Sequence, residues 1–338
     1  MKPLSFKTQS GLSLTETMVA LAISLILLAG VMQILMSNKQ SHRVQEAFAR
    51  LQENGRFAMQ FITRDLRMAG YMGCASLDTE PGNIVDLNQD GAADLIASFS
   101  GNGLQGKEYA DLPLALSDTV SLTTTNVVAG TDIVLIKHAS RTGVRLDDPV
   151  PTISGQLKLD ATTASGMFQP GDILFVTDCE QADVFAATST NAVGAAYVEI
   201  AHASTLNLSP PHLSKAYTTE AEVMKMQASA YYIANNSAGV PSLFKYSLGN
   251  ADTLNSQELV EGIEDLQVLY GVDSDGDRVV NRFVDASGVS NFSQVISARV
   301  TLRARTIEDN ITTNVTAFGD HRVRRSFTTL VTIRNRTS

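Results

Sequence analysis

Residues Met18 to Met36 read MVALAISLILLAGVMQILM, a stretch without a single charged side chain. As a helix, this stretch is long enough to cross the hydrocarbon core of a bilayer, which is roughly 30 Å thick. Apart from Glu16, the only charged side chains before it are those of Lys2 and Lys7. The positive-inside rule therefore predicts that the short N-terminus stays in the cytoplasm and that the rest of the chain lies across the membrane.

The helical pattern continues beyond the apolar stretch. Apolar or small residues recur there at alternating spacings of four and three, the period of a helix that packs by one face. These residues are Val44, Phe48, Leu51, Gly55, Ala58 and Ile62. Because no proline occurs between Pro3 and Pro81, we predict one helix from about Leu14 to about Met68, roughly 80 Å long. The alternative, a cleaved secretory signal, has an apolar region of about 7 to 15 residues and does not fit this length and continuity.

The composition restricts the class of protein. The chain has 338 residues, of which 44% are hydrophobic and 18% charged, so it can bury a sizeable core and is not disordered throughout. A formal net charge of -9 argues against a dedicated nucleic-acid binder, and we predict no direct binding of nucleic acid. The two cysteines are too few for a disulfide-dense scaffold.

The sequence after the helix is mainly a pattern of strands. Val295 to Arg305 alternates strictly between apolar and polar side chains, which predicts a half-buried strand. Further strands are predicted over residues 132–137, 172–177, 197–200, 229–233, 242–248, 266–272 and 327–334. We therefore expect an α+β fold in which an antiparallel sheet packs on the second half of the long helix, with residues 77–211 as a large β-rich elaboration.

Glu16 is a carboxylate at the edge of the apolar segment. Such a group costs a few kcal/mol or more unless it is paired or reaches the membrane interface. Lipid tails offer it no partner. Either the side chain is shallow enough to reach the headgroups, or another protein supplies a positive charge.

The residues around Glu16 resemble the class III signal of type IV pilins and type II secretion pseudopilins. Residues 11–16 read GLSLTE, after a short basic leader and before an unbroken apolar helix. The resemblance implies that a prepilin peptidase cuts after Gly11 and methylates the new N-terminus at Leu12. It also implies that Glu16 pairs with the amine of a neighbouring subunit during assembly. Leu12 replaces the usual phenylalanine, and Gln33 stands where major pilins often have a proline, which points away from a major subunit.

Four later segments are similar to minor pilins of the PilW type. They are TRDLRMAGYMGC (63–74), GDILFVTDCEQADVF (171–185), ELVEGIEDLQVLYGVDSDGD (258–277) and RRSFTTLVTIRNR (324–336). The resemblance implies a pilin-like fold and a minor pilin that primes type IV pilus assembly near the tip. The implied partners are the inner membrane, the prepilin peptidase, other minor pilins, the major pilin and a tip adhesin. The implied processes are twitching motility, adhesion or DNA uptake.

These inferences divide the chain into four parts. Residues 1–11 form a cleaved leader, residues 12–36 the membrane-spanning half of the helix, residues 37–70 its amphipathic half, and residues 71–338 the β-rich globular domain. We expect a single-pass inner-membrane protein with a cytoplasmic N-terminus and a periplasmic domain, which then enters a pilus fibre at the cell surface.

Cys74 and Cys179 face an oxidising compartment if this topology holds, so we predict a disulfide between them. The chain-entropy model assigns roughly 4.7 kcal/mol to a closed loop of about this length. Two free buried thiols are the alternative.

Two acidic loops have oxygen-bearing side chains at positions one, three, five and nine of an EF-hand-type calcium loop. In the first loop these residues are Asp86, Asn88, Asp90 and Asp94, and in the second they are Asp273, Asp275, Asp277 and Asn281. Position twelve, where a bidentate acid belongs, is Ala97 in the first loop and Val284 in the second. Each loop therefore needs further oxygen ligands, and a polar turn between strands is the alternative. Calcium is the one candidate cofactor.

The sequence contains no convincing catalytic motif. Residues 101–107, GNGLQGK, match most of a P-loop, but Glu108 stands where a Ser or Thr would hold magnesium, and we expect a surface turn. We therefore predict no enzyme. Two other functions remain as alternatives: a J-type pseudopilin of type II secretion, which is usually a shorter chain, and a membrane-anchored periplasmic receptor for calcium or another ligand.

Overall fold

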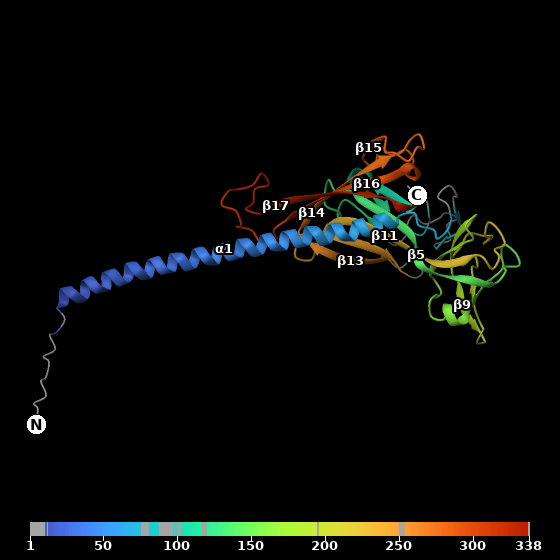
Figure 1. Ribbon diagram of the computed structural model, residues 1–338, viewed down its shortest axis with the longest axis horizontal. Coiled ribbons are helices and arrows are strands. Elements are labelled where there is room, and N and C mark those ends of the chain that lie inside the picture. The colour runs from blue at the N-terminus through green and yellow to red at the C-terminus, as the bar shows by residue number, and fades with distance from the viewer. Residues whose placement is uncertain are drawn as a thin grey trace, which may run out of the picture.

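The computed structural model describes residue 11 and residues 13–75, 81–87, 97, 99, 103–116, 120–194, 196–249 and 254–336. Its longest element is helix α1 (Leu14–Met68), which has the bounds predicted from the sequence. Ser13 caps the N-terminus of α1, because its side chain accepts a hydrogen bond from the backbone N–H of Glu16 at 3.3 Å. Figure 1 shows α1 as a continuous rod whose first half projects away from the β domain.

The second half of α1 packs on the β domain by one face. Leu51, Ala58, Ile62 and Leu66 are almost fully buried, as the four-and-three spacing predicts. Phe48 belongs to the same predicted stripe but is 39% exposed, so its inclusion was wrong. The packed face begins on the C-terminal side of Phe48, where the sheets reach the helix.

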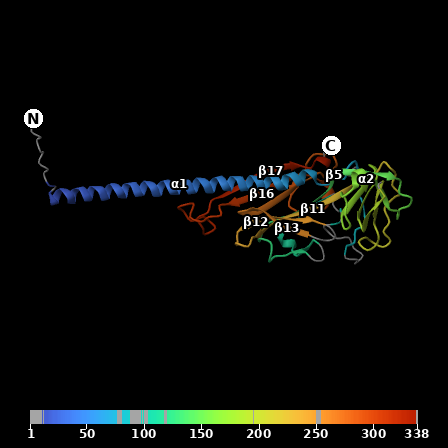
Figure 2. The ribbon, with the colours of Figure 1, turned by 90° about the horizontal axis from the view of Figure 1, so that it is seen from below.

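A four-stranded antiparallel sheet lies against this half of α1, with the strand order β15-β14-β16-β17. Its strands are β14 (Ile263–Val272), β15 (Arg282–Val284), β16 (Val295–Arg305) and β17 (Arg324–Thr332). Strand β16 confirms the predicted alternation from Ala298 onward: Ala298, Val300, Leu302 and Ala304 are buried and join the core that contains the buried face of α1. The first residues of the strand, 295–297, are all buried, so the alternation is wrong there. Figure 2 shows α1 running along β16 and β17.

The remaining long strands form a second, larger sheet, which has eleven strands in the described part of the chain. They are β1 (Gly82–Asn83), β2 (Leu104–Lys107), β5 (Ile133–Asp148), β6 (Leu157–Asp160), β7 (Ile173–Thr177), β8 (Ala182–Ala186), β9 (Ser189–Val193), β10 (Tyr197–Ala201), β11 (Glu222–Asn235), β12 (Pro241–Leu248) and β13 (Leu254–Glu261). Strands β3 (Leu114–Ala115) and β4 (Ser121–Leu122) pair separately, and the short helices are α2 (Ala161–Ala164), η2 (Tyr109–Asp111), η3 (Phe292–Gln294) and η4 (Arg334–Arg336). Every strand predicted from the sequence is present, which confirms an α+β fold with a long helix on a β domain.

The surface turn expected within residues 101–107 is wrong for its second part. Leu104–Lys107 is strand β2, which pairs antiparallel with β5, and Leu104 is fully buried. Gly106 faces Tyr270, whose ring occupies the space that a side chain at residue 106 would need. Gly106 therefore serves packing in the sheet.

The β domain extends far beyond α1. Strands β6 to β10 and the ends of β5 and β11 enclose a separate core that includes Leu159, Phe185, Val198 and Tyr217. This part lies at the end of the molecule opposite the N-terminal half of α1 (Figures 1 and 2). The limits of the elaboration, residues 77–211, stay a prediction.

Candidate functional site

The start of α1 presents Glu16 in its first turn, where a carboxylate also interacts favourably with the positive end of the helix dipole. Glu16 is exposed, and among the described residues its carboxylate has no hydrogen bond or ion pair. Gly11 is exposed as well, with open space around it, whereas Leu12 lies outside the described residues. The geometry therefore offers one unpaired acid at the end of the helix that is farthest from the β domain.

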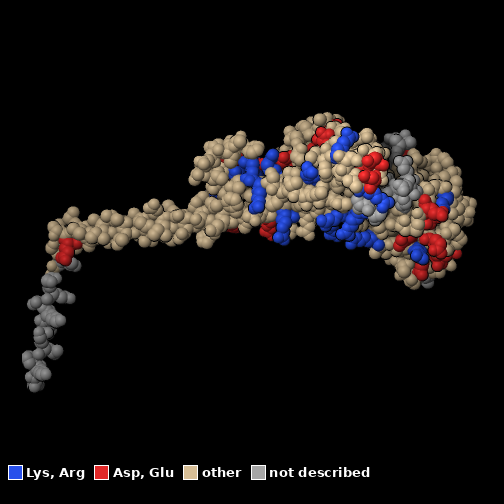
Figure 3. Space-filling model, turned by 45° about the horizontal axis from the view of Figure 1, so that its top comes forward, with Lys and Arg blue, Asp and Glu red and all other residues tan. Residues whose placement is uncertain are grey.

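The first half of α1 is apolar on all sides and contacts nothing else in the described chain. Residues 14–36 are all exposed, and α1 is the one described helix that is long and apolar enough to cross a membrane. Figure 3 shows the rod beyond Glu16 without charged side chains until it approaches the β domain. A surface of this size and composition is stable only in lipid or against other apolar helices.

The second half of α1 contacts the β domain at several points along its length. The guanidinium of Arg43 contacts the Glu308 carboxylate at 3.1 Å, and the Asn54 side chain donates to the Glu261 carbonyl at 3.0 Å. Gly55 lies directly under the ring of Phe327 on β17, so a side chain there would overlap the ring. Although glycine has a low helix propensity, Gly55 thus allows helix and sheet to approach closely.

Asp65, near the end of α1, adds polar contacts between the helix and the β domain. Asp65 accepts a hydrogen bond from the Tyr231 hydroxyl at 2.6 Å and pairs with the Lys245 ammonium at 2.9 Å. Burial, followed by the charge of Asp65, raises the pKa of Tyr231 far above its ordinary value. The tyrosine therefore stays a hydrogen-bond donor to Asp65 at any physiological pH.

The predicted disulfide is present. Cys74, six residues after α1 ends, is bonded to Cys179 in the turn between β7 and β8, with their Cα atoms 4.7 Å apart. Both cysteines are exposed. Cys179 has a φ of 73°, a left-handed conformation that non-glycine residues adopt at a cost. The bond ties the end of α1 to the elaboration, as the sequence led us to expect.

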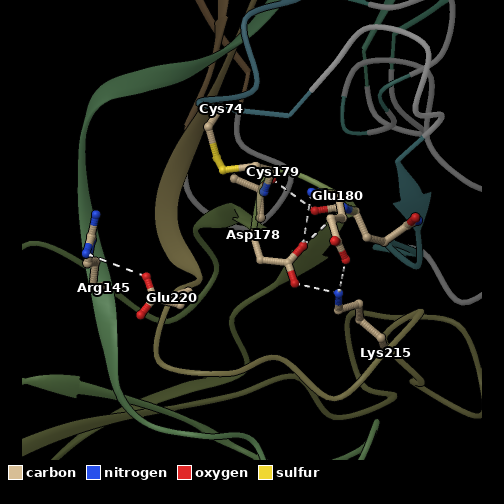
Figure 4. Close-up of a disulfide and its surroundings, with 9 residues drawn as sticks. Cys74, Arg145, Asp178, Cys179, Glu180, Lys215 and Glu220 are labelled. Carbon is tan, nitrogen blue, oxygen red and sulfur yellow. Dashed lines mark hydrogen bonds and ion pairs between the residues drawn. A yellow bond between two sulfur atoms is a disulfide. The ribbon is translucent and has the colours of Figure 1, made fainter.

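Charged side chains support the turn that carries Cys179 (Figure 4). Lys215 reaches both Asp178 and Glu180, the residues on either side of the cysteine. Although burial raises the pKa of Asp178, hydrogen bonds from Lys215 and the backbone of Gln181 lower it further than burial raises it. Asp178 is therefore charged at neutral pH and holds the turn in place.

The first acidic loop lies mostly outside the described residues. That applies to Asn88, Asp90 and Asp94, while Asp86 is described and buried, and its backbone N–H donates to the Leu206 carbonyl at 3.1 Å. The calcium interpretation of this loop stays a prediction.

The second acidic loop brings three of its four predicted residues together. Carboxylate oxygens of Asp273, Asp275 and Asp277 all lie within 4.8 Å of one another. The Asn281 side chain accepts from the Ser274 backbone N–H at 2.6 Å and donates to Asp275 at 3.3 Å, which closes the loop.

The loop also satisfies one of its acids with backbone groups. The two carboxylate oxygens of Asp273 accept from the N–H groups of Gly276 and Arg278 at 2.7 and 2.8 Å. Burial raises the pKa of Asp273, but these donors lower it by more, so the net pKa lies below the ordinary value. Arg278, at position six, has a φ of 66° and adopts the conformation that glycine supplies in a calcium loop. Calcium binding here stays a prediction.

A buried acidic pair was missed by sequence reasoning. Asp132 is 5% exposed, accepts from the Val268 N–H at 2.7 Å and hydrogen-bonds the side chain of Glu108. Burial raises the pKa of Asp132 to about 8, and Glu108 and Asp265 add to the increase. Asp132 therefore keeps its proton at neutral pH and can donate it in the hydrogen bond to Glu108, close to the fully buried Tyr270. Glu108 and Asp132 are 24 residues apart, in separate turn-like stretches, and carry no signal of this pairing in the sequence.

The comparisons with known proteins bear on both ends of the chain. Residues 6–32 match the family described as the prokaryotic N-terminal methylation motif, and residues 230–335 match the type IV pilus-assembly protein W family. These matches support a PilW-type minor pilin. No curated protein and no solved structure is significantly similar to the chain.

The two matched regions do not touch in the described chain: residues 14–32 are exposed, and the sheet inside the second match packs on the later half of α1, which lies between the matches. The methylation motif covers Gly11, Glu16 and most of the exposed half of α1, and it fits an inner-membrane anchor. The PilW match covers the end of β11 and all of β12 to β17, which include the sheet on which α1 docks. Residues 77–211 and both cysteines of the disulfide lie outside the two matches.

Proposed function

We propose that this chain is a PilW-type minor pilin that is cut after Gly11, methylated at Leu12 and incorporated near the tip of a type IV pilus. Its leader would be removed by a prepilin peptidase, and its β domain would lie in the periplasm before assembly. One observation carries the proposal: Glu16, exposed and unpaired in the described chain, opens a bare apolar half-helix that needs partners from outside the chain.

The proposed role is structural, with no catalysis. Glu16 neutralises the positively charged N-terminus of a neighbouring subunit in the membrane, where neither charge has another partner. The subunit primes polymerisation together with other minor pilins, the major pilin and a tip adhesin. Twitching motility, adhesion or DNA uptake then depends on it through the number of pili that form.

The test is the substitution Glu16→Ala in the full-length protein. Loss of one partner from a buried pair costs several kcal/mol, so we expect the amount of the subunit in sheared pili to fall about a hundredfold and motility to fall with it. Glu46→Ala is the matched control, because Glu46 is an exposed acid on the same helix that pairs with Arg50 at 2.6 Å. Normal pili with normal amounts of the Glu16→Ala subunit would overturn the proposal.

Two further measurements separate the alternatives. N-terminal sequencing of the mature protein should begin at a methylated Leu12, whereas an intact Met1 would leave a permanently anchored receptor. Deletion of the gene should abolish or reduce pili. A block in the export of folded proteins with normal pili would instead indicate a pseudopilin of type II secretion.

A further inference from the structure

The loop between β16 and β17, residues 306–323, is ordered by its own contacts. The backbone N–H of Thr316 donates to the Asp320 carbonyl at 2.7 Å, and the Thr316 hydroxyl donates to the Asp320 carboxylate at 2.6 Å. Arg324 holds the same carboxylate through two bonds of 2.8 Å. The hydrogen bond of Arg324, followed by other donors, lowers the pKa of Asp320, so the charge that closes the loop persists at neutral pH.

The tip of this loop is uncharged and exposes two large apolar side chains. Residues 313–319 read TNVTAFG, between Asp309 on one side and Asp320 on the other. Val315 is 64% exposed and Phe318 58% exposed. The guanidinium groups of Arg324 and Arg303 lie 4.0 and 5.3 Å from the centre of the Phe318 ring and hold it in place, while more than half of the side chain stays exposed.

The loop reaches toward the part of α1 that leaves the membrane segment. The Arg43 side chain donates to the Asp309 carbonyl at 2.7 Å and to the Glu308 carboxylate at 3.1 Å, so the base of the loop is level with Arg43. Figure 1 shows the loop, in red before β17, extending along α1 on the side of its N-terminal half. Among the described parts of the β domain it lies closest to the apolar half of the helix (Figures 1 and 2).

The distance along α1 from the apolar stretch to Arg43 is slightly greater than the thickness of the headgroup layer. Arg43 follows Met36, the last residue of the apolar stretch, by seven positions, which corresponds to about 10 Å of helix. The headgroup layer occupies roughly 5 to 8 Å on each side of the hydrocarbon core. A tip that extends beyond the level of Arg43 therefore comes to the boundary between headgroups and acyl chains.

We propose that the loop tip, residues 313–319, rests on the bilayer from which α1 emerges, with Val315 and Phe318 at the boundary between headgroups and acyl chains. The proposal rests on the membrane anchorage in the proposed function and adds a second point of contact, which limits how far the β domain can tilt. The occupant is lipid, because the loop extends along α1 toward the membrane-spanning segment and its tip carries no charged side chain to be buried. Residues 306–323 contain three acids and one arginine, so attraction to anionic headgroups is not the driving force.

The test uses the absence of tryptophan from the chain. A Val315→Trp variant of the full chain, reconstituted in nanodiscs of phosphatidylcholine and phosphatidylglycerol, carries one tryptophan at the tip. Val279→Trp is the matched control, because Val279 is 60% exposed in the loop between β14 and β15. The register places these two loops at opposite ends of β16, on the order of 30 Å apart.

We expect lipids brominated near the headgroup to quench Val315→Trp at least about twofold more than Val279→Trp, with little change between low and high salt. Equal quenching of the two variants would overturn the lipid contact. Ile26→Trp, in the apolar half of α1, checks the anchorage itself with lipids brominated near the ends of their acyl chains: if it is not quenched, the proposed function fails, rather than the loop contact alone.

The experiment can also detect a different partner for the loop tip, namely a neighbouring subunit in the filament. If Val315→Trp emission is unquenched in nanodiscs but shifts to the blue in assembled pili, the tip binds a neighbouring subunit and the lipid proposal is wrong. A Phe318→Ser change in the Val315→Trp chain should reduce the quenching, since it removes the second apolar side chain of the tip.

Discussion

The two halves of α1 have the same backbone and opposite surroundings. Residues 14–36 are all exposed in the described chain, whereas Leu51, Ala58, Ile62 and Leu66 in the second half are almost fully buried. The first half is apolar all round, and the second half carries an apolar stripe on one face. The difference teaches that the second half is satisfied by the chain's own sheets, while the first half must find its partners outside the chain.

The means of attachment differ as well. The second half is held by a close approach at Gly55, by the Asp65 contacts and by the disulfide that follows the helix. The first half offers the Glu16 carboxylate and apolar side chains. Changes aimed at one half should therefore leave the other half's behaviour intact.

Removing the disulfide should have the largest effect on the docked half. A Cys74→Ser, Cys179→Ser double variant opens a link across 105 residues, and the chain-entropy model assigns about 4.7 kcal/mol to a loop of this size. We expect a stability loss of about 3 to 5 kcal/mol, measured by urea denaturation of the full chain in detergent micelles. Wild-type protein treated with a reductant should lose the same amount. An unchanged midpoint in both samples would show that the helix end is held without the bond.

Gly55→Leu should have the next largest effect, because the new side chain overlaps the Phe327 ring. Overpacking of this kind costs about 2 to 3 kcal/mol, which exceeds the roughly 0.8 kcal/mol that leaving glycine gains in helix propensity. Gly30→Leu is the matched control, since nothing lies within 4 Å of a side chain at Gly30. We expect it to leave the unfolding midpoint of the β domain unchanged.

A second substitution distinguishes steric overlap at residue 55 from a general change in the stability of the helix. Adding Phe327→Ala to Gly55→Leu frees the space above residue 55, so the double variant should be more stable than the sum of the two single changes predicts. Strict additivity would contradict the account of Gly55 as a packing position.

The sequence was sufficient for the parts of the fold that repeat with a period. The bounds of α1 and the alternation of β16 followed from spacing alone, because the same apolar face meets the same core over many residues. Lys137 shows where this reasoning ends. It lies in the middle of β5 and is 1% exposed, although a lysine in an alternating strand suggests a solvent-facing position. Burial lowers its pKa to about 7.

The candidate site divides in the same way. Gly11, Leu12 and Glu16 lie within six consecutive residues, so a local motif was enough to propose them. The Asp132–Glu108 pair is made by tertiary folding, as is the contact of Phe327 with Gly55, and no local pattern reports either. The prediction that Phe48 belongs to the packed face was wrong, because periodicity identifies the face of a helix but not the residue at which the partner sheet begins to cover it.

A smaller effect should follow from the buried acidic pair under the sheet that carries α1. The pKa of Asp132 is about 8 in the folded chain against 3.8 in a model peptide, so the folded state holds a proton that the unfolded state releases. The contribution of this group to stability therefore falls as the pH rises from about 4 to about 8.

Asp132→Asn keeps a hydrogen-bond donor toward Glu108 and removes the titration. We expect a higher midpoint than wild type at pH 8, a difference that shrinks toward pH 4, and a flatter dependence between them, with Glu108, Asp265 and Tyr270 as the remaining groups around the site. Asp147→Asn, an exposed position near the other end of β5, is the control and should leave the slope unchanged. A wild-type slope in Asp132→Asn would mean that Asp132 does not hold the proton that the folded state retains.

The smallest effect concerns the loop of Asp273, Asp275 and Asp277, at the end of the four-stranded sheet where β16 begins. Three carboxylates within 4.8 Å repel one another, and a divalent cation would relieve that repulsion. With a Kd of about 0.1 to 1 mM, as in extracellular calcium modules, 2 mM calcium would stabilise the domain by about 1 kcal/mol relative to EGTA.

The measurement is the Tm of the full chain in detergent, with magnesium as the control for non-specific screening. Asp275→Asn should abolish the increase, because this acid lacks the two backbone donors that hold Asp273. Equal Tm values in calcium and EGTA would leave the loop as a turn that its own N–H groups close, and the docked half of α1 would then depend on no ion at this loop.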